Sequence, residues 1–267
     1  MGVRFVTHPA PEALAGAVRE LWLFEDDGDL HAGLPKPNVE LVISLSGIHF
    51  WRASLSGLDH RFDCAWLTPL QEASRYAWSS GRRRLIGARL EPWAAHSLFG
   101  ILPRGDGSPP PLLRNLIGDE ADRLRDRLTL APTEEACFLA FSAWLSGQPA
   151  LQMHRPLWRQ HKQRVSDLAE GLGISERSLR RRFSEDIGIA PKRWLRLKRL
   201  DGVLRDLASP NGGMSLTDLA DAHGFADQAH LNRELTRMTG ATPNRLKRRE
   251  SGTPPHLLIN PGRFVQE

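Results

Sequence analysis

Residues 176–183 carry side chains whose types and spacing suit contact with nucleic acid. Leu179 and Phe183 lie four residues apart, so on a helix they share one face and pack into a core. The outer face then carries three arginines and a serine: Arg177, Ser178, Arg181 and Arg182. Guanidinium groups bind phosphate oxygens and the guanine edge, and an exposed basic helix of this kind enters the DNA major groove.

The helix that would carry these side chains belongs to a unit that occurs twice. VSDLAEGLGISERSLRRRF at 165–183 is echoed by LTDLADAHGFADQAHLNREL at 216–235. Each copy places a Gly at the end of its first helix, where left-handed backbone is needed, and a side-chain N-cap before its second helix. These residues are Gly173 with Ser175 and Gly224 with Asp227. Two copies are too few for a solenoid, so we predict a pair of helix-turn-helix units.

Further helices are predicted beside these units. An apolar stripe over 191–207 indicates a rigid helix between them, and an apolar and basic segment at 151–159 is expected to pack on the first unit. Ser215 and Asp218 form a capping-box pattern for the first helix of the second copy. Arg164 occupies the equivalent position in the first copy and is a poor cap.

Charge is divided unevenly along the 267 residues, whose formal net charge is +5. Residues 1–150 hold 15 Lys and Arg against 18 Asp and Glu, whereas residues 151–250 hold 20 against 12. A basic part beside a mildly acidic part indicates a nucleic-acid-binding module joined to a part that binds another partner. We therefore expect domains at 1–150 and 151–250, followed by a tail at 251–267 that is either unstructured or packed on its neighbours.

The first 150 residues are expected to be rich in strands. Short β-branched and apolar segments separated by Gly, Asp and Ser favour a small antiparallel sandwich or barrel. The predicted strands are 39–45, 48–55, 61–67, 73–78 and 85–90, and the predicted helices are 11–24, 112–130 and 134–145. Thr133 would cap the last of these helices, with Ala136 and Leu139 on one face. The fold class is thus α+β, with a β-rich N-terminal domain, flanking helices and an all-α C-terminal domain.

The doubled unit, the helix between its copies and the closing GATPNRLKRRE resemble the DNA-binding domain of AraC/XylS-type transcription regulators over 151–249. The second copy matches the pattern GF.D..H..R......G.TP of that family at Gly224, Phe225, Asp227, His230, Arg233, Gly240, Thr242 and Pro243. The resemblance implies that one chain places two recognition helices in successive major grooves. It also implies sequence-specific DNA binding that is controlled by a small molecule or a partner bound to the N-terminal half.

The resemblance assigns roles to individual residues. The expected base-contacting residues are Ser175, Arg177, Ser178, Arg181, Gln228, Ala229, His230 and Arg233, and the expected phosphate-contacting residues are Arg180, Arg182, Lys192, Arg193, Arg199, Thr217 and Thr242. Ala229 departs from the larger polar residues of relatives, so the first unit is expected to supply more base-specific contact. His230 could instead pack against the first helix of its unit, and the basic residues could simply solvate a helix face.

The N-terminal half resembles the cupin-like sensory domains found before such DNA-binding domains, through the segment 37–47. Five histidines with Glu40 could suggest a cupin metal site: His8, His31, His49, His60 and His96. No H-x-H occurs, however, and we expect no metal. Trp22, Trp51, Trp66, Trp78 and Trp93 could line a pocket or form core, and Glu40 could be a buried, partnered acid or a ligand contact. The ligand candidates are Glu40, Trp51, Trp66 and Trp78.

Enzymatic activity is not expected. Cys64 and Cys137 provide neither a four-thiolate zinc site nor a disulfide scaffold, and no catalytic triad, phosphate loop or carboxylate pair is evident. A DNA-modifying or repair enzyme that uses the helix-turn-helix units for targeting is the alternative hypothesis. No export signal or membrane span is found, so the expected location is the cytoplasm. The expected partner is double-stranded DNA, with RNA polymerase, a small-molecule effector and a second copy of the chain as further candidates, and no cofactor is expected.

Overall fold

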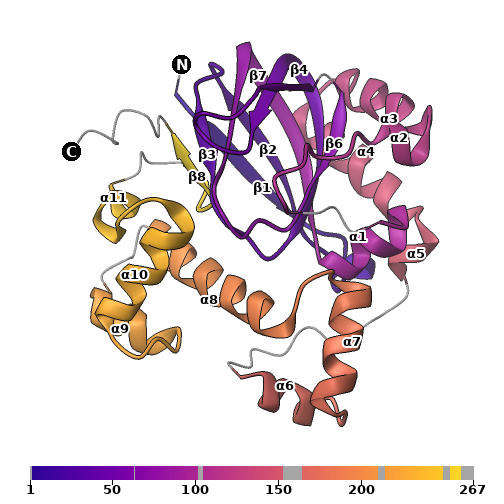
Figure 1. The fold of residues 1–267 in the computed structure, drawn as a ribbon. Coiled ribbons are helices and arrows are strands. Elements are labelled where there is room, and N and C mark those ends of the chain that lie inside the picture. Colours follow the sequence, from indigo (N-terminus) through magenta and orange to yellow (C-terminus); the bar gives the residue numbers. More distant parts are fainter. Residues whose placement is uncertain are drawn as a thin grey trace.

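The chain folds into a curled β-sheet followed by a helical region, as Figure 1 shows. The computed structural model describes residues 2–62, 64–101, 105–152, 164–209, 214–248 and 253–259. The predicted α+β class, with a β-rich N-terminal part and a helical C-terminal part, is confirmed. None of the helices within these ranges is both long and apolar enough to span a lipid bilayer.

The sheet is antiparallel and has β7 at its centre. Its strands are β1 (Arg4–Pro9), β2 (Val18–Asp26), β3 (His31–Gly33), β4 (Val39–Arg52), β5 (His60–Phe62), β6 (Ala65–Thr68), β7 (Arg75–Leu90) and β8 (Leu257–Ile259). Strand β7 pairs with β2, β3 and β4, β1 pairs with β2, and β5 and β6 pair with β4. These pairings curl the sheet around an interior space.

Both faces of the central strands are buried, and they face different surroundings. In β2, Leu21 and Leu23 lie in the main core, whereas Trp22 and Phe24 belong to a second apolar cluster with Val42 of β4. Successive side chains of a strand point to opposite faces, so one strand supplies both sets. The second cluster faces the interior space of the sheet.

The prediction of a helix at 11–24 is wrong. A short 3₁₀ turn, η1 (Glu12–Leu14), leads into strand β2. A strand buried on both faces presents a continuous apolar run, in which residues at helical spacing also occur by necessity. Leu14, Val18 and Leu21 therefore matched a helix although Val18 and Leu21 lie in a strand.

The predicted strands are present, but their boundaries differ. The segments expected at 39–45 and 48–55 are joined in β4, which passes through Gly47 with a φ of +92° and an irregular register. The segments at 73–78 and 85–90 belong to one long strand, β7, and 61–67 is divided between β5 and β6. Gly47 bends the strand and does not end it, because left-handed backbone there forms a bulge.

Helices pack along one side of the sheet. They are α1 (Pro92–Phe99), α2 (Arg114–Ile117), α3 (Glu120–Thr129), α4 (Glu134–Ser146) and α5 (Pro149–Gln152). The helix expected at 112–130 is interrupted at Gly118, where φ is +60°, and α1 was not predicted. Thr133 Oγ1 accepts a hydrogen bond from Ala136 N at 3.1 Å, which confirms that cap. The side of α4 that carries Leu139 is exposed, however, because the larger Phe138, Phe141 and Trp144 occupy the buried face.

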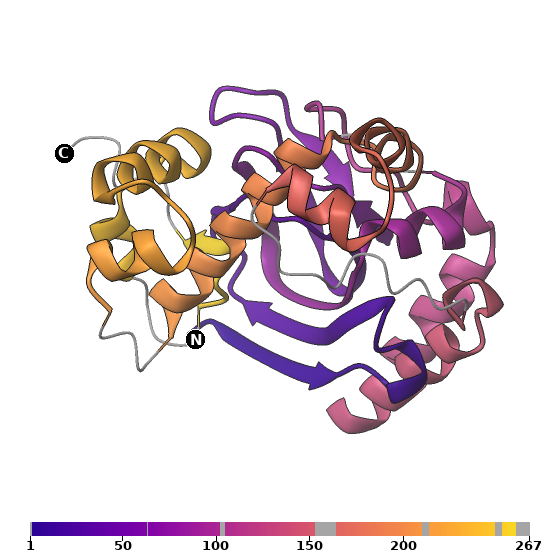
Figure 2. The ribbon, with the colours of Figure 1, turned by 90° about the horizontal axis from the view of Figure 1, so that it is seen from below.

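The C-terminal helices form two units at the ends of one long helix. They are α6 (Val165–Gly171), α7 (Glu176–Asp186), α8 (Pro191–Ala208), α9 (Leu216–Ala222), α10 (Gln228–Thr239) and α11 (Pro243–Lys247). Figures 1 and 2 show α8 beside one end of the sheet, with α6 and α7 at one of its ends and α9 to α11 at the other. The helix expected at 151–159 lies outside the described residues from 153 onward.

The C-terminal tail returns to the N-terminal sheet. Leu257 and Leu258 of β8 pair with Gly33 and Ala32 of β3 in antiparallel register. Leu34 N adds a hydrogen bond of 2.8 Å to the carbonyl oxygen of His256. Of the two possibilities left open for the tail, packing on its neighbours is therefore correct for 253–259.

A buried ion pair fastens β7 to the end of β2. Arg83 is 1% exposed and Asp26 is 5% exposed. Arg83 Nε donates to Asp26 Oδ1 at 2.5 Å, its Nη2 pairs with the other carboxylate oxygen, and Nη2 also donates to the carbonyl oxygen of Asp29 at 3.0 Å. Removing one partner of such a pair leaves an uncompensated buried charge.

We predict that Arg83→Met lowers the free energy of unfolding by about 3–5 kcal/mol, because Asp26 would remain buried without its partner. Urea denaturation followed by circular dichroism measures the change. Arg82→Met is the matched control, since the Arg82 side chain is 55% exposed and its loss should matter little. Equal effects of the two substitutions would contradict the importance of the buried pair.

Candidate nucleic-acid interface and interior cavity

The first helix-turn-helix unit holds α7 by a short turn and an apolar core. Gly173 has a φ of +62°, as the sequence predicted, and Ser175 Oγ accepts a hydrogen bond from Ser178 N at 3.1 Å. Leu179 and Phe183 are fully buried. Arg164, as expected, makes no side-chain cap to α6. The turn and the cap thus fix where α7 begins, and its two buried residues fix its rotation.

The outer face of α7 carries the predicted base-contacting arginines. Arg177 and Arg181 are exposed, whereas Ser178 is half-buried with its hydroxyl 3.0 Å from Ser175 Oγ. Both serine hydroxyls therefore already take part in the cap. Arg180 pairs with Glu176 one turn away at 2.8 Å, which leaves its charge partly neutralised on the surface. The two exposed arginines are the donors of this unit best placed for a ligand.

The second unit is closed by better caps. Ser215 and Asp218 form the predicted reciprocal capping box at the start of α9, and Asp227 Oδ1 accepts from His230 N at 2.6 Å at the start of α10. Gly224 has a φ of +69° in the turn, and Leu231 is fully buried. The sequence repeat thus corresponds to two structurally equivalent units.

The outer face of α10 presents Gln228, Ala229 and Arg233, which are all exposed. His230 is half-buried, lies edge-on to Phe225 with ring centroids 5.5 Å apart, and accepts a hydrogen bond at Nδ1 from Ala226 N at 3.3 Å. The His230 ring therefore already makes contacts within its own unit. This agrees with the alternative, left open by the sequence, that His230 packs inside the unit.

Several of the residues expected to touch phosphate have partners within the chain. Arg193 pairs with Glu72 of the N-terminal part at 2.6 Å. Arg199 donates to the carbonyl oxygen of Gly224 at 3.1 Å, with its guanidinium over the Phe225 ring. Thr217 Oγ1 donates to Gln228 Oε1 at 3.3 Å, and Thr242 caps α11. Arg182 is half-buried on α7 and Lys192 is exposed on α8.

Helix α8 is attached to the sheet domain by a buried acid that the sequence analysis did not single out. Asp201 is 2% exposed and lies on the apolar stripe of α8. It pairs with Arg205 on the same helix and with Arg19 of β2 at 3.5 Å. Its Oδ1 lies 3.0 Å from Nε2 of His256 in the tail. An acidic residue inside an otherwise apolar helical stripe was the sequence signal for this contact.

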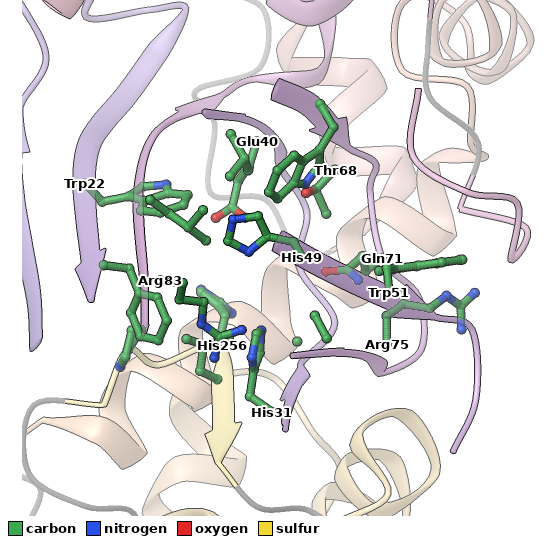
Figure 3. A pocket seen from close by; sticks show the side chains of 18 of the residues that line it. Trp22, His31, Glu40, His49, Trp51, Thr68, Gln71, Arg75, Arg83 and His256 are labelled. Atoms are coloured by element: carbon green, nitrogen blue, oxygen red, sulfur yellow. The ribbon is translucent and has the colours of Figure 1, made fainter. Parts of the chain in front are cut away.

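The curled sheet encloses a cavity of about 130 Å³. Four of the five tryptophans considered above line it, namely Trp22, Trp51, Trp66 and Trp78, whereas Trp93 is 2% exposed in the main core. Figure 3 shows Trp22 of β2, Glu40 and His49 of β4, and His256 of the tail at the cavity. The sequence therefore indicated most of its aromatic wall.

Glu40 is both a buried, partnered acid and a residue of the cavity wall. Its carboxylate pairs with Lys36 and lies 3.3 Å from Arg89 Nε. Burial alone would raise the pKa of Glu40, but the charges of Lys36 and Arg89 outweigh it and lower the pKa to about 2. Burial lowers the pKa of Lys36, which Glu40 partly offsets. The two alternatives for Glu40 are thus compatible.

Three cavity histidines are held in the neutral form. Burial, followed by the charge of Arg83, lowers the pKa of His31 well below its ordinary value and that of His49 to about 4. Burial, followed by the charges of Arg89 and Lys36, does the same for His256. Within the described ranges, no three His, Cys, Asp or Glu side chains are grouped so that they could hold a metal ion. Neutral histidines offer this site hydrogen-bonding nitrogens without charge.

The sequence analysis missed seven polar residues of the cavity wall: Lys36, Thr68, Gln71, Arg75, Arg83, Arg89 and His256. The first six come from strands and loops that come together only in the folded sheet. His256 begins the apolar segment HLLI of the tail, and this segment was the available signal for a strand that packs on the domain.

We predict that the contribution of Glu40 to stability depends on pH. Its pKa is lower in the folded chain than the ordinary 4.5, so its stabilising effect is present above pH 4.5 and is lost as the pH falls toward 2. The stability advantage over Glu40→Gln should therefore shrink by about 2 kcal/mol between pH 7 and pH 3. Urea denaturation at both pH values, with the exposed Glu135→Gln as matched control, measures it. A constant advantage would contradict an ionised Glu40 in the fold.

Comparisons with known proteins agree with the doubled unit. A family profile described as "Helix-turn-helix domain" matches residues 168–249. The chain is 26% identical over 155 residues to the virulence regulon transcriptional activator VirF of Yersinia enterocolitica, a match that covers 57% of this chain and 54% of VirF. It is 25% identical over 225 residues to the thermoregulatory protein LcrF of Yersinia pestis, covering 82% of this chain and 75% of LcrF. The chain thus spans about half the length of VirF.

Two solved structures resemble the chain at low identity. ToxT from Vibrio cholerae superposes with a TM-score of 0.45 and 10% identity, covering 90% of this chain and 96% of ToxT. A cupin superfamily protein from Desulfitobacterium hafniense gives a TM-score of 0.26 and 16% identity over 33% of this chain and 77% of that protein.

The doubled unit, its closing signature and the two related regulators support the resemblance noted in the sequence. Residues 168–249 thus form a helix-turn-helix domain, and the chain is similar to two transcription regulators, in agreement with its resemblance to the AraC/XylS type.

Proposed function

We propose that this chain binds a specific double-stranded DNA site through α7 and α10 and that a small molecule in the N-terminal cavity controls this binding. The observation that carries the proposal is the outer face of α7, where Arg177 and Arg181 are exposed beside a capped helix start. Arginine can donate two hydrogen bonds to guanine O6 and N7, and helix starts of this kind enter the major groove.

The two units contribute unequally in this proposal. Arg177 and Arg181 supply base contacts from α7, and Gln228 and Arg233 supply them from α10. Ala229 offers only a methyl group, so α10 contributes fewer directional contacts. Ser175, Ser178 and His230 are already hydrogen-bonded within their units, which makes their proposed contacts secondary.

The residues proposed to contact phosphate also differ in how many partners they already have within the chain. Lys192 is exposed on α8 and is the simplest phosphate ligand of the set. Arg193 would have to leave Glu72 before it could reach DNA, and Arg199 is occupied by Gly224 and Phe225. Arg180, Arg182, Thr217 and Thr242 complete the proposed backbone contacts.

We also propose a separate task for each part of the chain. Residues 1–150 sense the effector and provide a surface for a second copy, and residues 151–250 bind DNA. The tail at 251–267 connects the two parts through its described residues 253–259, which contain β8. The protein acts without catalysis, in the cytoplasm, and RNA polymerase is its further partner at a promoter.

We predict that Arg181→Ala and Arg233→Ala each cost about 1–3 kcal/mol at the specific DNA site and relax base preference there, because each loses a bidentate contact. Genomic fragments retained by the protein define the site, and fluorescence anisotropy with matched and base-substituted duplexes measures the change. Arg181→Ala should have the larger effect. Equal losses on specific and random duplexes would contradict the base-contacting role.

Two controls separate the contributions. Arg127→Ala removes an exposed arginine from α3 and should leave affinity unchanged. Lys192→Ala should weaken all duplexes alike and reduce the salt dependence of binding by about one released ion. Together these variants distinguish base contacts from phosphate contacts and from net charge.

A further inference from the structure

The interior cavity is closed by a segment that follows the DNA-binding helices in the chain. Pro254, His256 and Leu257 line it together with residues of the N-terminal strands. His256 is 4% exposed, and its carbonyl oxygen accepts the hydrogen bond from Leu34 N. Figure 3 shows the His256 and His31 rings pointing to the same cavity, one from the tail and one from β3. One wall of the cavity therefore belongs to the C-terminal tail.

The size and wall of the cavity select a single aromatic ring. Its volume of about 130 Å³ is close to the roughly 150 Å³ that accommodates benzene in a protein interior. Phe50 and Trp78 stack with ring centroids 5.2 Å apart, and Trp66 lies 5.5 Å from Phe62 on another side. Aromatic rings favour offset or edge contacts with other rings at such distances.

The charged side chains of the wall are already engaged within the protein. Glu40 is shared by Lys36 and Arg89, and Arg83 is held by Asp26. Arg75 donates to the carbonyl oxygens of Ala53, Ser74 and Gly105. A ligand carboxylate would have to displace one of these partners and would leave it buried without compensation. The cavity therefore favours an uncharged ligand.

Four polar atoms of the wall supply the remaining specificity. Trp22 Nε1, His31 Nδ1, Gln71 Oε1 and His256 Nδ1 are buried and have no hydrogen-bond partner within the described part of the chain. The indole nitrogen can only donate, the amide oxygen can only accept, and a neutral imidazole nitrogen does one or the other. Buried polar atoms without partners are costly, so a ligand that both donates and accepts would stabilise this wall.

We propose that the cavity binds an uncharged molecule with one aromatic ring and a hydroxyl-type group, and that residues 254–257 of the tail form part of its site. This inference rests on the proposed function in one respect, because it takes the bound molecule to be the effector that controls DNA binding.

The same tail residue connects the site to the helix between the two DNA-binding units. His256 Nε2 lies 3.0 Å from Asp201 Oδ1, and Asp201 is also held by Arg19 of β2 and Arg205 of α8. A ligand that contacts Nδ1 of His256 therefore acts on the ring that faces the buried acid of α8. Ligand binding is coupled in this way to the placement of α7 and α10.

Phenol is the probe that tests the ligand class on the full chain. Phenol at ten times its dissociation constant should raise the melting temperature by about 3 °C and change tryptophan fluorescence, because four tryptophans line the cavity. Benzoate, which is charged, and 1-naphthol, which has two rings, should give no stabilisation at equal concentration. Stronger binding of benzoate or 1-naphthol than of phenol, or no effect of phenol at 10 mM (roughly the weak limit of specific binding), would overturn the proposal.

Two variants test the position of the site. Val42→Phe extends a wall residue into the cavity and should abolish phenol binding, and His256→Ala should weaken it at least about fivefold through the lost tail contact. Arg127→Ala, which removes an exposed side chain of α3, is the matched control and should bind phenol as the wild type does. Unchanged phenol affinity in either cavity variant, with a native circular dichroism spectrum, places the ligand elsewhere and overturns the proposal.

The same samples separate this proposal from the proposed function. Sequence-specific DNA binding by a chain that does not bind phenol overturns the cavity assignment alone. Phenol binding by a chain without specific DNA affinity supports the cavity assignment and overturns the proposed function.

Discussion

A charge that is withdrawn from water must be paired, and three buried carboxylates impose this constraint on the whole chain. Asp26 fastens β2 to β7 through Arg83, and Glu40 joins β4 to Arg89 of β7 and to Lys36. Asp201 pairs with Arg205 of α8 and Arg19 of β2, and its Oδ1 lies 3.0 Å from Nε2 of His256 in the tail. The first two acids hold the curled sheet together, and the third attaches α8, which joins the two helix-turn-helix units, to it.

This pairing also determines the chemistry of the cavity. Four cationic side chains line the cavity, but Glu40 pairs with Lys36 and Arg89, Asp26 pairs with Arg83, and backbone carbonyl oxygens bind Arg75. The interior therefore offers aromatic surface and neutral hydrogen-bonding atoms. The lowered pKa values of His31, His49 and His256 have the same origin, since burial and nearby cations both disfavour protonation. The charged groups of the cavity wall are thus already bound within the protein, and its histidines are neutral.

The helix-turn-helix units were predictable because their signals are local. Gly173, Ser175, Gly224 and Asp227 each act within one turn of the chain, and the structure confirms every one of these turns and caps. The helix between the units was predictable from its apolar stripe, although the partners of Asp201 on that stripe lie far away in sequence.

The sheet was predictable in class but not in detail. Residues 11–24 satisfied helical spacing, yet the neighbours β1 and β7 bury both faces of β2 and make it a strand. Strand β8 pairs with β3 across more than 220 residues, a contact that no local pattern encodes. The tryptophans of the cavity could be named from their composition and alternation, whereas Lys36, Gln71 and His256 join them only through tertiary pairing.

The C-terminal ends of α7 and α10, the two helices proposed to contact DNA, are both bound by the N-terminal part of the chain. His96 Nδ1 of α1 lies 2.9 Å from the carbonyl oxygen of Glu185 in the last turn of α7, and Ser74 Oγ donates to the carbonyl oxygen of Thr239 at the end of α10 at 2.8 Å. The last carbonyl groups of a helix have no partner within the helix, so an outside donor fixes the helix end. Two features therefore determine the separation of α7 and α10. One is the length of α8, and the other is the pair of contacts that His96 and Ser74 of the N-terminal part make with the two helix ends. Under the proposed function, a ligand that changes the shape of the N-terminal part would change both contacts at once, and two successive grooves of one duplex accept only one separation of the two helices.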